Sequence, residues 1–162
     1  MVHGFNRDTK VNTEFDCILK DDMLSSLSME KYEGKKGIVD ISNLNTPPEK
    51  HELMTANYFA DLGMDVVFIR ASNIPGVYRP DIMMDGTEWE IKSPEGKGKR
   101  TIEKIYHKAA MQSKNIIFDL RRCRIPESTC LTQLEREFKD KLTKRLLVIK
   151  KNGELVEFSK SG

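Results

Sequence analysis

Two acidic residues and a lysine in the middle of the chain, Asp81, Glu90 and Lys92, have the types and spacing of a group that could hold a cation. Between them lies the pair Asp85-Gly86, which is typical of a two-residue type I′ turn in a hairpin. Counting outwards from this turn places Asp81 opposite Glu90. The alternation of side chains along a strand puts Lys92 on the same face as Glu90. Two facing carboxylates repel each other unless a cation lies between them, and their hard oxygen atoms suit Mg²⁺.

A group of this kind could hydrolyse a phosphodiester bond. A bound Mg²⁺ ion polarises a phosphate and lowers the pKa of a coordinated water. A neighbouring lysine, here Lys92, can orient that water or stabilise the negative charge that develops on the phosphate. We therefore expect metal-dependent hydrolysis with Mg²⁺, and Mn²⁺ or Zn²⁺ are alternatives.

The spacing Asp81-x8-Glu90-x-Lys92, preceded by Pro80, resembles the active-site motif of the PD-(D/E)XK nuclease superfamily. Within that superfamily, residues 49–120 are most similar to the C-terminal tRNA nuclease toxin domains of CdiA-type contact-dependent inhibition proteins. The segments that carry this similarity are Glu52-x3-Ala56-x6-Gly63-x2-Val66, Pro80-Asp81, Trp89-Glu90-Ile91-Lys92-Ser93 and Gln112-Ser113-Lys114-Asn115-Ile116-Ile117. The resemblance covers less than half of the 162 residues.

This resemblance implies a metal-dependent endonuclease, most readily a bacterial toxin domain that cleaves tRNA in the cytoplasm of a target cell and has a cognate immunity protein. A DNA endonuclease of the same superfamily, associated with a phage or mobile element, would carry the same motif. A nucleic-acid-binding module without activity is the alternative of another class. The resemblance also implies that the backbone carbonyl of Ile91 is a further metal ligand. It implies an acidic residue on the upstream helix as well.

Two glutamates could supply that helix-borne acid, Glu49 and Glu52. The run Thr46-Pro47-Pro48-Glu49 reads as a helix start, in which Thr46 caps the helix and Glu49 completes a Thr-x-x-Glu capping box. Glu52 has no such local role and lies one turn before Ala56, as in the family pattern. We therefore favour Glu52 and keep Glu49 as the alternative.

Basic and polar residues that follow the motif are candidate contacts to nucleic acid. The glycine–lysine loop at 95–100 lacks the spacing of a Walker A loop, so it reads either as a solvated loop or as a phosphate contact. Gln112 matches a family position and could contact Lys92 or the substrate. His51 reads as a surface residue. The candidate contacts are Ser93, Lys97, Lys99, Arg100, Thr101, Lys104, Lys108, Gln112, Arg121 and Arg122.

The distribution of charge supports a nucleic-acid partner more than its total does. The chain has 27 Lys+Arg and 25 Asp+Glu, a net charge of +2. Residues 1–90 hold 9 basic and 16 acidic side chains, whereas residues 91–124 hold 10 basic and 3 acidic ones. An acidic block followed by a basic block indicates a phosphate-binding surface beside a cation site.

Composition excludes several other classes. No apolar run approaches the ~18 residues that a membrane-spanning helix needs, so we expect no membrane partner. The polar N-terminus lacks the apolar segment of a secretory signal. The 3 cysteines include no Cys-x-x-Cys pair, so we expect free thiols in a reducing compartment and no structural zinc site.

The elements that must position these residues follow from the periodicity of the apolar residues. Helices are expected at 47–62, 101–114 and 128–143, the last with Leu142 facing inward. Strands are expected at 64–70, 80–84, 87–92, 115–120, 145–150 and 155–159. This order predicts an α/β fold with a restriction-endonuclease-like core, a mixed central sheet flanked by helices, over residues 46–162. Residues 1–45 read as an N-terminal extension of uncertain structure, with a helical piece near 18–31 and a short strand near 38–41. The oligomeric state stays open.

Overall fold

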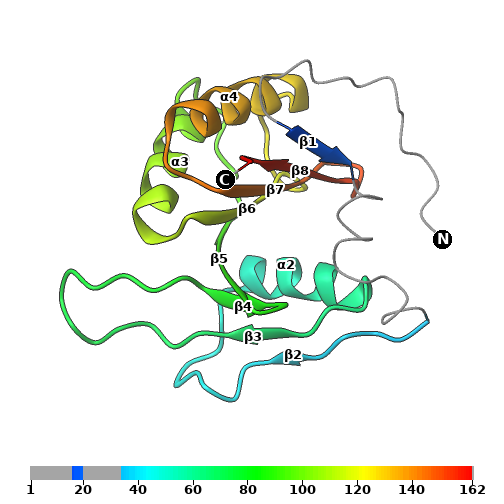
Figure 1. The fold of residues 1–162 in the computed structure, drawn as a ribbon, viewed down its shortest axis with the longest axis vertical. Helices are drawn as coiled ribbons and strands as arrows, with labels where there is room; N and C mark the ends of the chain where they lie inside the picture. Colours follow the sequence, from blue (N-terminus) through cyan, green and yellow to red (C-terminus); the bar gives the residue numbers. More distant parts are fainter. Residues whose placement is uncertain (1–15, 20–33, 162) are drawn as a thin grey trace.

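The computed structural model describes residues 16–19 and 34–161, in which one mixed sheet is flanked by helices (Figure 1). The strands are β1 (Asp16–Leu19), β2 (Val39–Asp40), β3 (Val66–Phe68), β4 (Ile82–Met84), β5 (Thr87–Lys92), β6 (Asn115–Asp119), β7 (Arg145–Ile149) and β8 (Leu155–Ser159). The helices are α2 (Lys50–Asp61), α3 (Thr101–Gln112) and α4 (Glu127–Asp140). The strand order is β1-β8-β7-β6-β5-β4-β3-β2. The predicted α/β class, with a mixed sheet flanked by helices, is confirmed.

Both faces of the central strands are buried, which explains why β6 and β7 read as continuous apolar runs. Ile117 and Leu147 belong to the core under α2, together with Trp89 of β5. Their sequence neighbours Ile116 and Leu146 belong to the other core, under α3 and α4. The sheet is therefore the middle layer of three, with α2 on one face and α3 and α4 on the other.

Strand β5 joins two differently organised parts of the sheet. Its first half pairs antiparallel with β4, in the register Ile82↔Trp89 and Met84↔Thr87. Its second half pairs parallel with β6, from Glu90↔Ile116 to Lys92↔Phe118. Because β4 is shorter than β5, one edge of β5 is left open at Glu90 to Lys92, where the candidate residues lie.

The predicted hairpin turn is confirmed. Asp85 and Gly86 both have positive φ angles, 50° and 73°. A type I′ turn requires this at both central positions, and aspartate and glycine tolerate it best.

Helix α2 begins three residues later than the sequence analysis predicted. Its N-cap is Glu49, which has φ −58° and ψ 145°, and its first helical residue is Lys50. Pro47 precedes another proline, Pro48, and the ring of a proline disfavours helical geometry in the residue before it. The predicted capping box between Thr46 and Glu49 is therefore wrong.

The end of the predicted C-terminal helix is also wrong. Helix α4 stops at Asp140, and Leu142 is 89% exposed instead of facing inward. Lys141, the C-cap residue, is extended, with φ −107° and ψ 165°, so the chain leaves the helix before Leu142 could reach the core.

The N-terminal extension supplies both edge strands of the sheet. Strand β1 pairs antiparallel with β8, and β2 pairs parallel with β3. The strand expected near residues 38–41 is confirmed as β2. The helix expected at 18–31 is wrong at residues 18 and 19, which lie in β1, and the rest of that range lies outside the described residues. Among the described helices, none is long and apolar enough to cross a membrane.

Gly37, two residues before β2, lies so close to the backbone near the end of α2 that its substitution tests how tightly this segment is packed. Its N–H donates to the carbonyl of Ala60 at 2.8 Å, and a Cβ added to it would lie 1.9 Å from the backbone oxygen of Met64. Because the clash is with backbone, no rotamer change relieves it. We expect Gly37→Ala to lower the free energy of unfolding by about 3 kcal/mol in urea titrations.

The matched control is Gly34→Ala. Gly34 has φ +73° and open space around its Cα, so the substitution should cost only the ~1–2 kcal/mol of a left-handed residue. Equal losses in the two variants would contradict a close contact at Gly37.

Candidate functional site

The start of β4 brings Asp81 against the open edge of β5. The Asp81 N–H donates to the carbonyl of Trp89 at 3.0 Å, and the Asp81 carbonyl accepts from the N–H of Ile69 at 2.8 Å. The Asp81 carboxylate accepts the N–H of Ile91 at 2.7 Å. The hairpin register thus carries Asp81 across from the Glu90 region, one residue beyond the end of the β4 ladder.

Glu90 is a buried carboxylate with half of its hydrogen-bonding capacity unused. The residue is 1% exposed, and its Oε1 accepts a hydrogen bond from Lys92 Nζ at 2.5 Å. Its Oε2 is buried and has no hydrogen-bond partner in the described part of the chain. A buried carboxylate oxygen without a partner is costly, and such atoms are rare unless a ligand or ion satisfies them.

Three acidic residues influence one another's protonation at this place. Burial, and then the negative charge of Asp81, raise the pKa of Glu90 to about 7. Burial raises the pKa of Asp81, while the Ile91 N–H, the Lys92 ammonium and a hydrogen bond from a protonated Glu90 carboxyl act in the opposite direction. Burial, followed by the charge of Asp81, also raises the pKa of Glu52. Crowded carboxylates with raised pKa values are typical of sites that bind a cation or transfer protons.

Glu52 reaches this place from the first turn of α2. Its carboxylate accepts the backbone N–H of Glu49 at 3.0 Å, so it does have the local capping role that the sequence analysis assigned to Glu49. Glu49, Glu52 and Asp81 line one cleft of about 490 Å³, with Arg70 on the loop after β3. Of the two glutamates, Glu52 is the one whose pKa the charge of Asp81 raises, so Glu52 stays the favoured helix-borne acid.

The donor set fits a hard cation with open coordination positions. No three His, Cys, Asp or Glu side chains form a ready-made metal cage in residues 34–161. Two carboxylates, from Asp81 and Glu90, converge, and the unpaired Oε2 of Glu90 is free to ligate. In a strand, the N–H and C=O of one residue point to the same side, so the Ile91 carbonyl faces Asp81 as its N–H does. Mg²⁺ commonly uses few protein ligands and retains waters.

Lys92 is held by oxygens from two elements. Its Nζ donates to Glu90 at 2.5 Å and to Gln112 Oε1, at the end of α3, at 3.3 Å. The expected contact between Gln112 and Lys92 is therefore present. An ammonium has three N–H bonds, so the contacts within the described residues leave one for a water or a phosphate.

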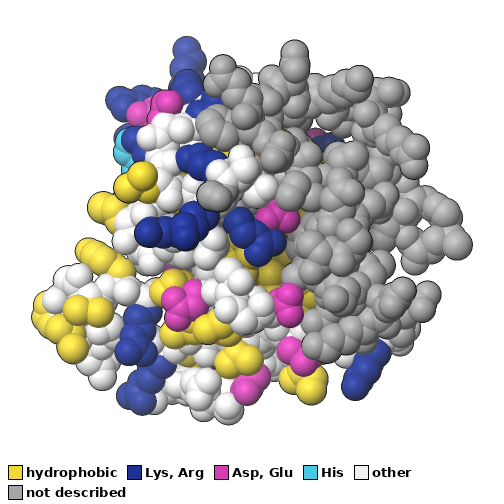
Figure 2. Space-filling view, in the orientation of Figure 1, with side chains coloured by type: hydrophobic (Ala, Val, Ile, Leu, Met, Phe, Trp, Pro, Cys, Tyr) yellow, Lys and Arg dark blue, Asp and Glu magenta, His cyan; other side chains and the backbone are white. Residues whose placement is uncertain are grey.

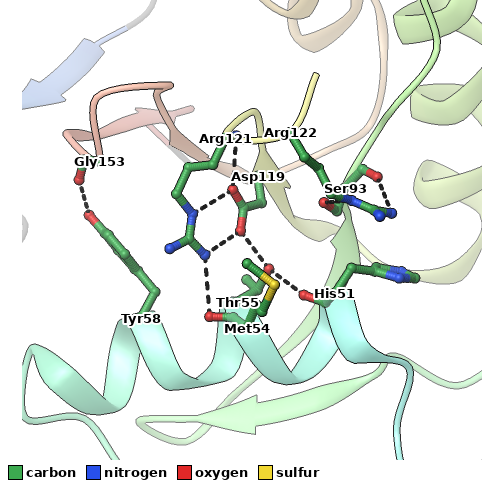
Figure 3. A network of polar contacts seen from close by, with 9 residues as sticks. All are labelled: His51, Met54, Thr55, Tyr58, Ser93, Asp119, Arg121, Arg122 and Gly153. Atoms are coloured by element: carbon green, nitrogen blue, oxygen red, sulfur yellow. Dashed lines mark hydrogen bonds and ion pairs between the residues drawn. The ribbon is translucent and has the colours of Figure 1, made fainter. Parts of the chain in front are cut away.

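A second polar group ties α2 to the carboxyl end of β6 (Figure 3). Asp119 is buried and accepts two hydrogen bonds from the Arg121 guanidinium, at 2.9 and 2.6 Å. The hydroxyl of Thr55 lies 2.7 Å from Asp119 and 3.1 Å from the carbonyl of His51. Arg121 also donates to the carbonyl of Met54 at 3.2 Å. This group fixes the first two turns of α2, which carry Glu52.

The charge of Asp119 is stabilised despite its burial. Burial by itself raises the pKa of Asp119, but the hydrogen bonds from Arg121 and Thr55 outweigh it and lower the pKa below its ordinary value. The Arg121 guanidinium also lies over the ring of Tyr58, 5.1 Å from its centroid. The Tyr58 hydroxyl donates to the carbonyl of Gly153 at 2.7 Å.

Arg122 fixes the chain that follows Lys92. Its Nε donates to the Ser93 hydroxyl at 2.8 Å and its Nη2 to the Ser93 carbonyl at 3.0 Å (Figure 3). Its Nη1 donates to Glu95 at 2.5 Å. Sequence reasoning missed these internal roles of Arg121 and Arg122 because two of their partners, Met54 and Ser93, are distant in sequence. The only local signal was an acidic residue, Asp119, two positions before Arg121.

The remaining candidate contacts lie on the loop after β5 and on α3. Lys97, Lys99, Lys104 and Lys108 are exposed. Arg100 is paired with Glu103 at 2.8 Å. The Thr101 hydroxyl is packed inside the loop, since a Cβ on Gly96 or Gly98 would lie 3.0 or 3.2 Å from it.

Cys123 and Cys130 are free thiols, as expected. Both are buried, with their sulfur atoms 3.7 Å apart. Neither lies among the candidate site residues.

Comparison with known proteins supports the resemblance described above. Residues 78–155 match the model of a family described as the contact-dependent growth inhibition CdiA C-terminal domain. The fold is similar to a solved CdiA-CT/CdiI toxin and immunity complex from Burkholderia pseudomallei, with a TM-score of 0.56. Sequence identity to that structure is 20%, and the similarity covers 75% of this chain and 98% of that chain. No curated protein sequence matches the chain.

The matched segment contains Asp81, Glu90, Lys92 and Gln112, whereas Glu52 lies before it. The predicted similarity to CdiA C-terminal domains is therefore confirmed for residues 78–155, and the fold agrees with a structure of that kind. The PD-(D/E)XK assignment and the roles of the individual residues stay predictions.

The crowded carboxylates predict a pH-dependent stability. The pKa of Glu90 is raised from an ordinary 4.5 to about 7, so the folded protein binds this proton more tightly than the unfolded chain does. The stabilisation of the folded state by the proton on Glu90 is full below pH 4.5 and is lost as the pH rises through about 7. In EDTA at pH 8, we expect Glu90→Gln to be about 2 kcal/mol more stable than the parent, with a flatter pH profile in denaturant titrations.

Glu88→Gln is the matched control, because Glu88 is exposed and lies two residues away on the same strand. It should leave the profile of the parent unchanged. Parallel profiles for Glu90→Gln and the parent would contradict the raised pKa of Glu90.

The tie between α2 and β6 predicts a second change in stability. Thr55→Val keeps the shape of the side chain but removes the hydroxyl that faces the buried Asp119. We expect it to lower the free energy of unfolding by about 1–3 kcal/mol in urea titrations. Thr55→Ser keeps the hydroxyl and should lose less. A larger loss in Thr55→Ser than in Thr55→Val would mean that the methyl group, not the hydrogen bond, holds the helix.

Proposed function

We propose that the chain is a metal-dependent nuclease of the PD-(D/E)XK type and acts as a toxin domain in contact-dependent inhibition. One observation carries the proposal: Glu90 is buried beside Asp81 with an oxygen that has no hydrogen-bond partner in the described residues. A cation between the two carboxylates would satisfy that oxygen and relieve their repulsion. The similarity of residues 78–155 to the CdiA C-terminal family supports the toxin context.

The residues divide the work as follows. Asp81, Glu90 and the carbonyl of Ile91 would hold Mg²⁺, and Glu52 would contribute from the cleft wall, directly or through a water. The metal would supply polarisation of the phosphate and a more acidic water. Lys92 donates to Glu90 and to Gln112 within the protein. Its third N–H would donate to the attacking water or to the phosphate oxygen.

The proposed substrate is RNA, with tRNA favoured and DNA as the alternative. Exposed lysines on the loop after β5 and on α3 would contact the phosphate backbone: Lys97, Lys99, Lys104 and Lys108. We assign Arg121 and Arg122 to positioning, because their guanidinium groups bind Asp119 and Ser93 within the protein. Contacts of this kind make affinity depend steeply on salt.

A cognate immunity protein is the proposed partner, and the cytoplasm of a target bacterium is the proposed place of action. The similar structure from Burkholderia pseudomallei is a complex of a toxin with its immunity protein, which supports such a partner here. A binding module without activity would have no need for an unpaired carboxylate at its centre. The presence of Asp81, Glu90 and Lys92 together therefore favours the enzyme.

Cleavage assays test this proposal. We expect the parent protein to cut tRNA with Mg²⁺, and Asp81→Asn or Lys92→Met to lower the rate roughly 100-fold or more, because each removes a metal ligand or a charge at the reacting phosphate. Plasmid DNA in parallel reactions distinguishes the two substrates. Glu88→Gln is the control and should cut at the parent rate.

Full activity in Asp81→Asn would contradict the site. Absence of cleavage by the parent with any divalent metal, on either substrate, would contradict the nuclease proposal and favour the binding module.

A further inference from the structure

Residues 70–80, which connect β3 to β4, form an arm that projects from the sheet (Figure 1); we call it the β3–β4 arm. It carries three large apolar side chains close together in sequence and all exposed: Ile74 (65%), Val77 (47%) and Tyr78 (62%). Figure 2 shows apolar side chains gathered at the end of this arm and basic side chains between it and the rest of the molecule. A cluster of exposed apolar groups on a long loop usually marks a contact with a partner or ligand.

The tip of the arm has a defined shape. The N–H of Val77 donates to the carbonyl of Ile74 at 3.1 Å, and Gly76 has φ +78°. Proline followed by glycine with positive φ, here Pro75-Gly76, is the signature of a type II turn. The Ser72 hydroxyl also accepts the N–H of Ile74 at 3.1 Å. The apolar side chains are therefore presented to solvent by a folded turn.

The arm is basic, although it lies in the acidic part of the sequence. It contains Arg70 and Arg79, both exposed, and no acidic residue between them. Tyr78 is the immediate neighbour of Arg79. An exposed aromatic ring beside arginines suits a nucleic acid, in which bases stack on the ring and phosphates pair with the guanidinium groups.

The arm is continuous with the candidate site. Arg70, Ala71 and Asn73 line the same cleft as Glu52 and Asp81. The two ends of the arm are joined at its base, where the Asp81 carbonyl accepts the N–H of Ile69. A strand of nucleic acid in the cleft would therefore meet the arm next.

We propose that the β3–β4 arm binds an unpaired nucleotide next to the scissile phosphate, with the base stacked on Tyr78 and flanking phosphates on Arg70 and Arg79. This inference rests on the proposed function and narrows its substrate to nucleic acid with unpaired bases, such as the loop of a folded RNA. A paired duplex keeps its bases inside the stack and offers none to Tyr78.

Binding experiments without cleavage test the arm. The full chain in EDTA is titrated into a labelled RNA stem–loop and into a fully paired duplex of the same stem, and fluorescence anisotropy gives the Kd. We expect Tyr78→Ala to weaken stem–loop binding roughly 10- to 100-fold and to leave duplex binding unchanged. Tyr78→Trp should keep the parent affinity. Arg79→Gln should reduce the slope of log K against log salt by about 1.

Leu142→Ala is the matched control, because it removes another exposed apolar side chain outside the cleft. It should bind both RNAs as the parent does, and all variants should unfold at the same temperature.

Unchanged stem–loop binding in Tyr78→Ala, or equal losses for stem–loop and duplex, would overturn the arm proposal while RNA cleavage by the parent still stood. Loss of immunity-protein binding in Tyr78→Ala, with RNA binding intact, would identify a protein contact and also overturn it. A parent that neither binds nor cuts nucleic acid would overturn the proposed function as well.

Discussion

The repulsion between the buried carboxylate of Glu90 and the half-buried carboxylate of Asp81 is the constraint on which the rest of this structure depends. Burial and proximity both disfavour their charged forms, and the raised pKa of Glu90, about 7, expresses that cost. One lysine, Lys92, offsets part of it through a single oxygen of Glu90. The other oxygen has no partner in the described residues, so the fold tolerates here a group that a proton shared with Asp81 or an added cation would satisfy. A folded chain accepts such a cost where it serves function.

The remainder of the fold keeps those two carboxylates from moving apart. Strand β5 is held by β4 at one end and by β6 at the other, so neither Glu90 nor its neighbours can leave the site. Helix α2 would be free to slide over the sheet if it were held by apolar contacts alone. The buried Asp119, which contacts Thr55 of α2 and is held by Arg121, fixes the position of the helix. The place of Glu52 beside Asp81 therefore depends on residues far from both in sequence.

Local sequence signals predicted the parts of the site that local geometry controls. The Asp85-Gly86 turn set the hairpin register, and alternation then placed Glu90 and Lys92 on one face. The predicted start of α2 was wrong because the capping-box pattern was used alone. It did not take into account that Pro48 disfavours helical geometry at the residue before it, Pro47. The role of Arg121 in holding α2 could not be predicted, since Met54 and Thr55 reach the Arg121–Asp119 pair only through the packing of α2 against β6. Glu52, favoured by sequence similarity, lies near enough to Asp81 for their charges to interact, although the local reason given for choosing it was wrong.

The net charge of a block of sequence does not tell which charged side chains are exposed on the surface. The basic block at 91–124 includes Arg121 and Arg122, whose guanidinium groups are paired with acidic side chains within the protein. The acidic block at 1–90 includes the β3–β4 arm, which carries two exposed arginines and no acidic residue. The positive surface available to a phosphate backbone near the candidate site therefore includes exposed lysines after β5 and, separately, the arm. The acidic cleft lies at the base of that arm, so a polyanion held by its arginines would reach the carboxylates only where a cation neutralises them.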